Sequence, residues 1–236
     1  MTDDNVRVGA LRVSREKALA AAHAYLRPAA GVHSAYPAYD SYQPEHDPDR
    51  LSDADLLAPV LLNVRHFSLE AFYGLRERRS ELERLLRQIA HDARLEESAD
   101  GDLNLLGSFF SVLDGAGLPG VGCSILAKIL HRKRPGFIPL YDRYIWYCYQ
   151  DAPGAPVPPD SKRSWAAYGV LLGRAIRDDL HRHHPTWQEI SGYAHAPAIT
   201  PLRALDIIAW HAGRAANRPR RSHVGGLRSA SWRGAA

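Results

Sequence analysis

The sequence has few cysteines and no long apolar segment. Cys123 and Cys148 are its two cysteines, and both lie in segments with a helical pattern, so we expect reduced, packed side chains. No apolar run approaches the roughly 18 residues that a membrane span needs, and the first residues lack the apolar core of a secretory signal. We therefore expect a cytoplasmic protein without a membrane partner, a metal or another cofactor.

Acidic residues are also scarce in two places, and this affects which partners are expected. The formal charge is +4, but residues 217–236 contain five arginines and no acid, so the rest of the chain carries −1. Residues 118–145 hold five lysines and arginines against Asp142 alone. If the protein binds phosphate, this second segment is the expected contact.

Runs of alternating apolar and polar residues are not evident, whereas apolar residues often recur at helical spacing. An apolar stripe begins after Ser164, Thr200–Pro201 begins another helix that Gly213 can end, and Ser80 with Glu83 forms a capping-box pattern. Helices are also expected at 15–26, 53–62, 68–78, 103–114 and 143–150. These patterns predict an all-α fold.

Loops and a tail complete the expected organisation. Residues 27–49 and 151–162 are too rich in proline, glycine and aspartate for regular structure. The arginine-rich segment 217–236 has few residues to bury and is predicted to be a disordered tail. We therefore expect one helical domain over residues 1–216, of unknown oligomeric state.

The segment "LPGVG", Leu118 to Gly122, interrupts two apolar helical patterns. It predicts a helix–hairpin–helix unit over 103–133, in which the second helix begins near Cys123. The first amides of such a helix have no partner within it, and its positive end favours anions. Gly120 and Gly122 carry no Cβ that would keep a phosphate away. A plain connection between two helices is the alternative.

With Asp142 twenty residues after Gly122, this pattern resembles the helix-hairpin-helix DNA glycosylase superfamily. The resemblance covers about 103–150. It implies a two-lobed helical fold with the hairpin at a central cleft, a DNA strand held at its backbone, and Asp142 at the mouth of a base pocket. The expected backbone contacts are Gly120, Val121, Gly122, Ser124, Lys128 and Arg143. The segments "DLLAP.LLN" and "LHRKRP.FIPLYDR" further resemble an actinobacterial family without an assigned activity.

Asp142 suits the chemistry that the resemblance implies. Breaking an N-glycosidic bond develops positive charge on the sugar, which a carboxylate can stabilise while it orients or deprotonates water. The base must first leave the duplex stack, so a backbone contact and a pocket belong together. An N-cap on the helix after Asp142 is the alternative role, and the two roles are compatible.

Three departures from the family's sequence pattern narrow the expected activity and substrate. Bifunctional members place a lysine two residues after the last hairpin glycine, where this chain has Ser124, so a monofunctional hydrolase is expected. Lys128, one turn further on, could approach the same cleft, but a contact with phosphate or solvent is the preferred expectation. The family's iron–sulfur cluster lacks its four cysteines here. "LYDRY" replaces the usual sequence around the aspartate, which leaves the base open.

Further pocket candidates come from aromatic residues and one acid. Tyr141 and Tyr144 flank Asp142 and could stack on a base. Asp206 falls on the buried face of the helix after Thr200. It is either held there by an arginine or a helix N-terminus, or it lines the cleft together with Trp210. Tyr39, in the first long loop, is either part of a lid or solvated.

The leading hypothesis is a glycosylase-type hydrolase that acts in DNA repair on a damaged or modified base, with Asp142 assisting attack by water. One alternative is a DNA-binding helix-hairpin-helix module without catalysis. The other is a hydrolase of free nucleotides, which suits the charge of −1 outside the tail.

Overall fold

Helices make up most of the protein, as the sequence predicts, and one β-hairpin joins them. The computed structural model describes residues 4–115 and 118–217. Its α-helices are α1 (Arg15–Leu26), α2 (Ala38–Ser41), α3 (Leu69–Glu77), α4 (Arg79–Leu86), α5 (Leu103–Phe110), α6 (Cys123–Lys133), α7 (Arg143–Trp146), α8 (Trp165–Arg182), α9 (His184–Ser191) and α10 (Pro201–Ala216). Short helices of other types are η1 (Asp55–Leu62), η2 (Leu95–Glu97), η3 (Ser111–Leu113) and the π-helical turn η4 (Tyr147–Asp151).

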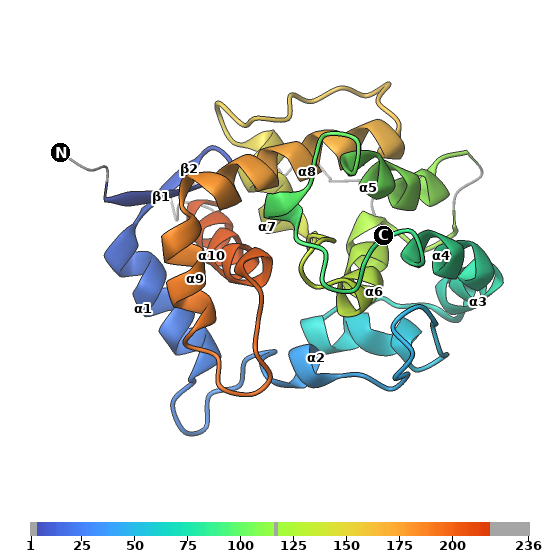
Figure 1. The fold of residues 1–236 in the computed structure, drawn as a ribbon, viewed down its shortest axis with the longest axis horizontal. Helices are drawn as coiled ribbons and strands as arrows, with labels where there is room; N and C mark the ends of the chain where they lie inside the picture. Colours follow the sequence, from blue (N-terminus) through green and yellow to red (C-terminus); the bar gives the residue numbers. More distant parts are fainter. Residues whose placement is uncertain (1–3, 116–117, 218–236) are drawn as a thin grey trace, which may run out of the picture.

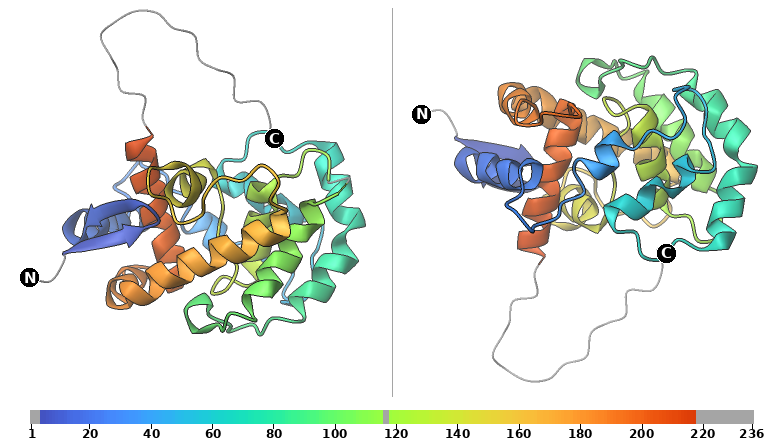
Figure 2. Two further views of the ribbon diagram at one scale, coloured as in Figure 1. Left: turned by 90° about the horizontal axis from the view of Figure 1, so that it is seen from above. Right: turned by 90° about the horizontal axis from the view of Figure 1, so that it is seen from below.

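The helices lie in two groups that α8 connects. Helices α1, α9 and α10 lie with the hairpin on one side, and α3, α4, α5 and α6 lie on the other (Figures 1 and 2). Helix α8 packs along α5 in the second group and contacts α9 and α10 in the first. Helix α7 packs on α10. The segment before α7 therefore lies where the two groups meet.

Polar caps explain where several helices begin. Ser164 accepts a hydrogen bond from Ala167 N–H (3.1 Å) at the start of α8, and Thr200 accepts one from Arg203 N–H (3.2 Å) at the start of α10, as predicted. The predicted capping box at Ser80 is wrong. Helix α4 already begins at Arg79 without a side-chain cap.

Glu83, the other half of that predicted box, accepts a hydrogen bond from the backbone N–H of Leu51 (2.9 Å). Its carboxylate therefore fixes the long first loop against α4 and does not cap the helix. Gly213 was predicted to end α10, but the helix continues to Ala216. A Cβ on Gly213 would lie 2.7 Å from Tyr144 O, so this glycine allows α7 to pack closely on α10.

The hairpin of β1 (Asn5–Val8) and β2 (Leu11–Ser14) was not predicted. Its strands pair antiparallel with Val8 opposite Leu11, so a two-residue turn connects them. The turn packs inside the protein, since Gly9 N–H donates to Asp179 (2.6 Å) and Ala10 N–H donates to Cys148 O (2.8 Å). Each strand has four residues, too few for alternation to distinguish it from a helix.

Two predicted helices adopt other geometries. The prediction at 53–62 corresponds to the three-ten helix η1, in which Pro59 has no N–H to donate. The prediction at 143–150 corresponds to one turn of α7 followed by η4. The helix predicted over 103–114 is divided into α5 and η3. These changes leave the predicted order of segments intact.

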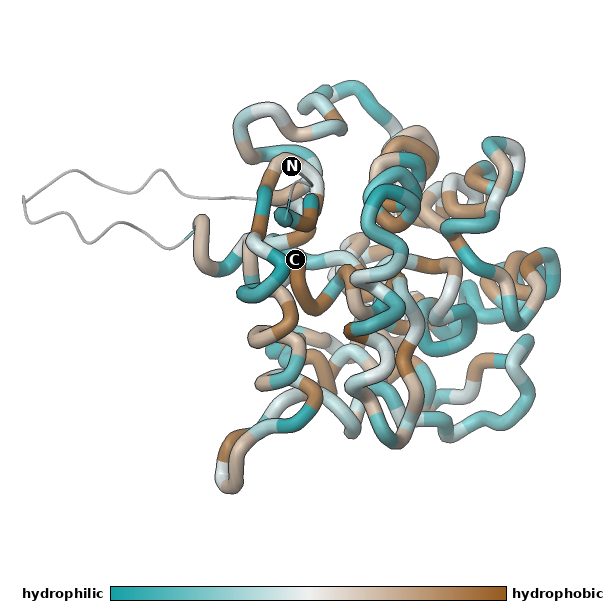
Figure 3. Tube along the Cα trace, turned by 60° about the vertical axis from the view of Figure 1, so that its left-hand side comes forward, coloured by the Kyte–Doolittle hydropathy of each residue, from teal (hydrophilic) through white to brown (hydrophobic). Residues whose placement is uncertain are grey.

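Hydrophobic residues alternate with hydrophilic ones along the helices (Figure 3). Among the described residues, no helix combines the length and apolarity that crossing a bilayer demands. Cys123 and Cys148 are buried and free, as predicted. The predicted tail at 217–236 lies outside the described residues apart from Asn217.

Candidate active site

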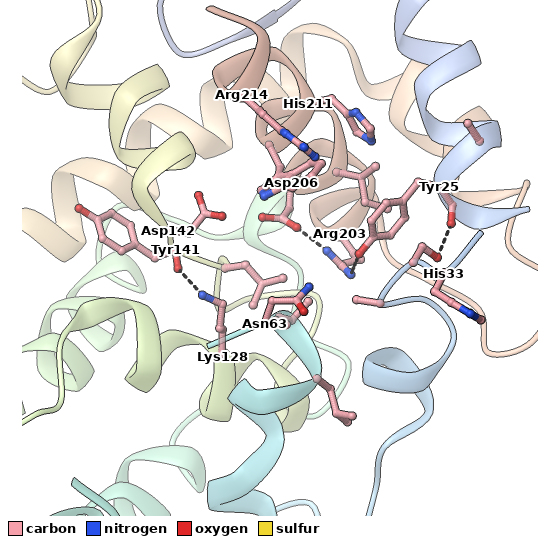
Figure 4. A pocket seen from close by; sticks show the side chains of 18 of the residues that line it. Tyr25, His33, Asn63, Lys128, Tyr141, Asp142, Arg203, Asp206, His211 and Arg214 are labelled. Atoms are coloured by element: carbon pink, nitrogen blue, oxygen red, sulfur yellow. Dashed lines mark hydrogen bonds and ion pairs between the residues drawn. The ribbon is translucent and has the colours of Figure 1, made fainter. Parts of the chain in front are cut away.

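A cavity of about 600 Å³ lies beside the segment that precedes α7. Its wall combines parts of the chain that are far apart in sequence: α1 and the following loop, the end of η1, α6, the segment at 140–142, and α10. The volume is in the range of small-molecule sites. Polar side chains dominate one part of the wall: Tyr25, Lys128, Asp142, Arg203, Asp206 and His211 (Figure 4).

Asp142 lines this cavity and caps α7 at the same time. Its Oδ1 accepts hydrogen bonds from the backbone N–H groups of Tyr144 (2.8 Å) and Ile145 (3.0 Å). No donor to Oδ2 is found within the described ranges of the chain. The cap therefore fixes the direction of the side chain, and one carboxylate oxygen stays available to a ligand.

Lys128 also lines the cavity, so the alternative in which it approaches the cleft agrees with the structure and the solvated one does not. Its residue is 6% exposed, and its ammonium donates to Ser124 Oγ (2.6 Å) and Tyr141 O (3.3 Å). Burial lowers the pKa of Lys128, and the charge of Asp142 opposes this shift. A cation is thus held between the first turn of α6 and the backbone beside Asp142.

Asp206 belongs to a buried ionic network centred on Arg203. The Arg203 guanidinium donates to both oxygens of Asp40 (2.9 and 3.2 Å), to the hydroxyl of Tyr25 (3.0 Å), and to Asp206 Oδ2. Asp206 was predicted either to be held by an arginine or to line the cleft, and it does both. Burial and, less strongly, the charge of Asp142 raise the pKa of Asp206 to about 6, although Arg203 acts in the opposite direction.

Aromatic residues form other parts of the wall. Tyr141 and Trp210 line the cavity as predicted, whereas Tyr144 does not. Tyr144 instead packs edge-to-face on Trp210 at 5.8 Å between ring centroids, and the exposed Arg143 lies over the Tyr144 ring at 4.5 Å. Aromatic side chains of the wall therefore come from α1, with Tyr25, and from α10, with Trp210, whereas the Tyr141 ring packs edge-to-face on Tyr168.

Tyr39 is not a lid residue or a solvated one. It lies in the short α2, is fully buried, and donates from its hydroxyl to Lys128 O (2.6 Å). Its ring stacks near His131 at 6.2 Å, with Arg132 over it at 5.3 Å. The first long loop thus supports the cavity from behind, through α6.

The hairpin segment offers fewer contacts than predicted. Val121 is buried and its N–H donates to Leu118 O (2.9 Å), so neither its side chain nor its amide is available. Gly120 adopts φ +71°, and a Cβ there would lie 3.1 Å from Ser68 Oγ, so the turn itself requires glycine. Within the described residues, no acceptor is found for the backbone N–H groups of Gly122 and Ser124.

Several wall residues were not predicted. Arg203 precedes Asp206 by three residues on α10, a spacing that indicates an ion pair on one helix face. Asn63 adopts φ 59° after η1, and an asparagine after an apolar run is a signal for this conformation. Tyr25 carries no local signal, since its hydroxyl meets Arg203 only through the tertiary fold. His211 and Arg214 lie further along α10.

His211 differs from the other wall residues in having an unused ring nitrogen. Its Nε2 is buried, and no partner is found for it in the described part of the chain. Burial, followed by the charge of Arg214, lowers the pKa of His211, so its ring is neutral near pH 7. Arg214 lies over the Trp210 ring at 5.0 Å. These side chains offer one uncharged acceptor or donor and one cation.

The described residues contain no cluster of three or more His, Cys, Asp or Glu side chains arranged to hold a metal ion. What the cavity offers is two carboxyl groups in different environments, a buried ammonium and aromatic walls. This combination suits acid–base chemistry on a flat polar ligand.

Comparisons with known proteins give one result. Neither the curated proteins nor the solved structures include a significant match to this chain. One family model matches residues 18–213, a range that includes every cavity residue named above except Arg214. The chain therefore belongs to a family of unknown function, DUF6308.

Proposed function

We propose that this protein is a monofunctional DNA glycosylase-like hydrolase that cleaves the N-glycosidic bond of a damaged or modified base. The observation that carries the proposal is the position of Asp142, whose carboxylate caps α7 and opens onto the cavity. The cavity is large enough for an extruded nucleoside, and Tyr25 and Trp210 provide aromatic side chains in its wall for a base.

In this proposal Asp142 Oδ2 lies beside C1′ of the bound nucleotide. As the bond to the base breaks, the carboxylate stabilises the positive charge that develops on the sugar and orients water for attack at C1′. The two backbone hydrogen bonds to Oδ1 hold the group in place, so little reorientation is needed in the transition state. No lysine is required as a nucleophile.

The proposed architecture is two-lobed, with the helix-hairpin-helix unit at the cleft between lobes. The two groups of helices that meet near α7 support it, as does the order of α5, the turn and α6. The free N–H groups of Gly122 and Ser124 lie at the positive end of α6 and suit one DNA phosphate. Arg143, exposed beside Asp142, suits a neighbouring phosphate.

A hydrolase of free nucleotides is the second candidate, and the residues at one side of the cavity favour it. His33, His211 and Arg214 line this part of the wall, and Arg214 forms no salt bridge within the described residues. A phosphate on the ligand itself would suit them. In that case the cavity binds the whole nucleotide, and the hairpin has no DNA to hold.

The test is base release by the protein and its Asp142→Asn variant, measured by mass spectrometry on oligonucleotides with assorted modified bases and on the corresponding free nucleotides. Asp102→Asn is the matched control, because Asp102 also accepts a backbone hydrogen bond at a helix start, from Ala99 N–H (2.8 Å), outside the cavity wall.

Release from DNA by the parent and by Asp102→Asn, but not by Asp142→Asn, is the expected result. Release from nucleotides alone favours the second candidate. DNA binding without release in any of the three proteins would contradict catalysis and favour a binding module.

A further inference from the structure

Asp206 lies across the cavity from Asp142, and the mechanism above leaves it unused. In Figure 4 the two carboxyl groups point toward one another, from the start of α7 and from the middle of α10. Asp206 is 9% exposed. Arg203 holds its Oδ2, and no described residue donates to its Oδ1, so one oxygen is fixed and the other is available to a ligand.

Arg203 cannot neutralise Asp206 alone, because its guanidinium already forms a bidentate pair with Asp40. The buried cluster contains three acids, Asp40, Asp142 and Asp206, and two bases, Arg203 and Lys128. With all five ionised the cluster carries one net negative charge inside the protein. Burial disfavours such an excess, so the cluster takes up one proton as the pH falls through about 6.

Of the three acids in the cluster, Asp206 binds this proton most favourably. Asp40 has both oxygens bound to Arg203, and Asp142 accepts two backbone hydrogen bonds that favour its charged form. Asp206 is buried and has Arg203 as its one donor among the described residues, which is consistent with its pKa of about 6. The other ionisable groups that face Asp206 add no negative charge near pH 7, since burial raises the pKa of Tyr25 and of Tyr39.

The cations at the edge of the cluster form no ion pair with its acids among the described residues: Arg132 lies over the Tyr39 ring at 5.3 Å and donates to Tyr42 O (3.0 Å). Arg214, two turns after Asp206 on α10, lies over the Trp210 ring at 5.0 Å instead of pairing with a described carboxylate. His211 has its pKa lowered by burial and is neutral. The two carboxyl groups therefore have different surroundings: Asp142 accepts two backbone hydrogen bonds, whereas Asp206 is buried beside one shared arginine, the pattern of a base and an acid in one site.

We infer that Asp206 is a second catalytic residue, which protonates the leaving base while Asp142 remains ionised. This inference rests on the proposed function. The C1′–N bond breaks and its electron pair goes to the base, which takes the proton from Asp206 Oδ1. Water forms the new C1′–O bond and gives its proton to the Asp142 carboxylate. Exchange with solvent after product release returns a proton to Asp206 and frees one from Asp142.

A purely structural Asp206 that only holds Arg203 is the rival explanation, and the charge of the leaving group separates the two. A neutral base such as hypoxanthine needs a proton to leave. A base alkylated at N7, such as 7-methylguanine, already carries a positive charge and leaves without one. Asp206→Asn keeps an oxygen for Arg203 but cannot supply the proton, so it affects only the first class.

The experiment measures single-turnover release from oligonucleotides carrying either class of base, by the parent, Asp206→Asn and Asp142→Asn. We expect Asp206→Asn to slow release of neutral bases at least about 100-fold while N7-alkylated bases change by less than about threefold. Asp142→Asn slows both classes. In the parent, release of neutral bases falls as the pH is raised through about 6. A ¹³C NMR titration of the Asp206 carboxyl provides a readout that needs no turnover.

The outcomes divide clearly. Four results would overturn this role and leave base release intact. Asp206→Asn could slow both classes equally or slow neither, the parent could release only N7-alkylated bases, or the Asp206 signal could fail to titrate between pH 4 and 8. A parent that releases neither class overturns the proposed function and this role with it.

Discussion

Asp142 carries two roles at once, helix cap and charged group, and replacing it with residues of graded capping ability separates them. Asparagine and serine cap helices about as well as aspartate, whereas alanine does not. Asp142→Ala loses the hydrogen bonds from Tyr144 N–H and Ile145 N–H, whereas the other two variants retain an acceptor.

The expected magnitudes follow from that geometry. Loss of an N-cap costs about 1 kcal/mol, so Asp142→Ala lowers Tm by about 2–4 °C, and Asp142→Asn and Asp142→Ser change it by less. Base release should fall by about 10²–10³ in all three variants, because each removes the negative charge that faces the sugar. Stability and activity therefore respond to different properties of one side chain.

Thermal unfolding followed by circular dichroism gives Tm, and mass spectrometry gives base release. Ser164→Ala is the control, because Ser164 caps α8 through Ala167 N–H (3.1 Å) outside the cavity wall, so it should lower Tm without slowing release. Parental rates of release in Asp142→Asn or Asp142→Ser would refute the reasoning, since the charge would then be unnecessary.

Three further predictions concern packing and protonation. Gly213→Ala should cost about 1–3 kcal/mol, because its Cβ would lie 2.7 Å from Tyr144 O; urea unfolding measures this, and Gly101→Ala, with open space around it, should change little. Lys128→Met should raise the pKa of Asp206, because the lysine charge lowers it; an NMR titration that shows a fall contradicts the cluster described above. Asp206 has a pKa of about 6 in the folded protein, against 3.8 for an unperturbed aspartate, so between pH 4 and 6 the native state binds a proton that the unfolded chain has lost. Its contribution to stability is therefore greatest below pH 4, falls as pH rises to 6 and is level above, and urea midpoints of the parent relative to Asp206→Asn should show this fall.

Local signals in the sequence were sufficient for most helices. Ser164 and Thr200 precede apolar residues at helical spacing, and both cap helices as predicted. Asp142 before a short aromatic segment indicated a cap, and the structure confirms it. Such features depend on residues within one or two turns, so a single sequence contains the necessary information.

The cavity wall could be predicted only in part, because its composition depends on tertiary contacts. Asp206 and Trp210 were found from the buried face of one helix. For Lys128 the cleft was the less favoured alternative, since nothing nearby in the sequence indicates that Tyr141 O and Ser124 Oγ accept hydrogen bonds from its ammonium. Tyr39 was assigned to a loop of polar and turn-forming residues, but its hydroxyl bonds to the backbone of α6.

The arginine network shows the same limit. The pairing of Arg203 with Asp206 is a helix spacing that can be read from the sequence. Its pairing with Asp40 and Tyr25 joins α10 to segments more than 160 residues earlier, and no local pattern specifies it. Without those partners, the charge excess that distinguishes the two cavity carboxyl groups could not be deduced.

Tyr39 and Asp40, adjacent in α2, connect to α6 and α10 through the Lys128 carbonyl and the Arg203 guanidinium. The floor of the cavity is thus tied to the first forty residues and to the last described helix together. A shortened protein that begins after α2, or one that stops before α10, would therefore lose part of the cavity wall together with part of the hydrophobic core.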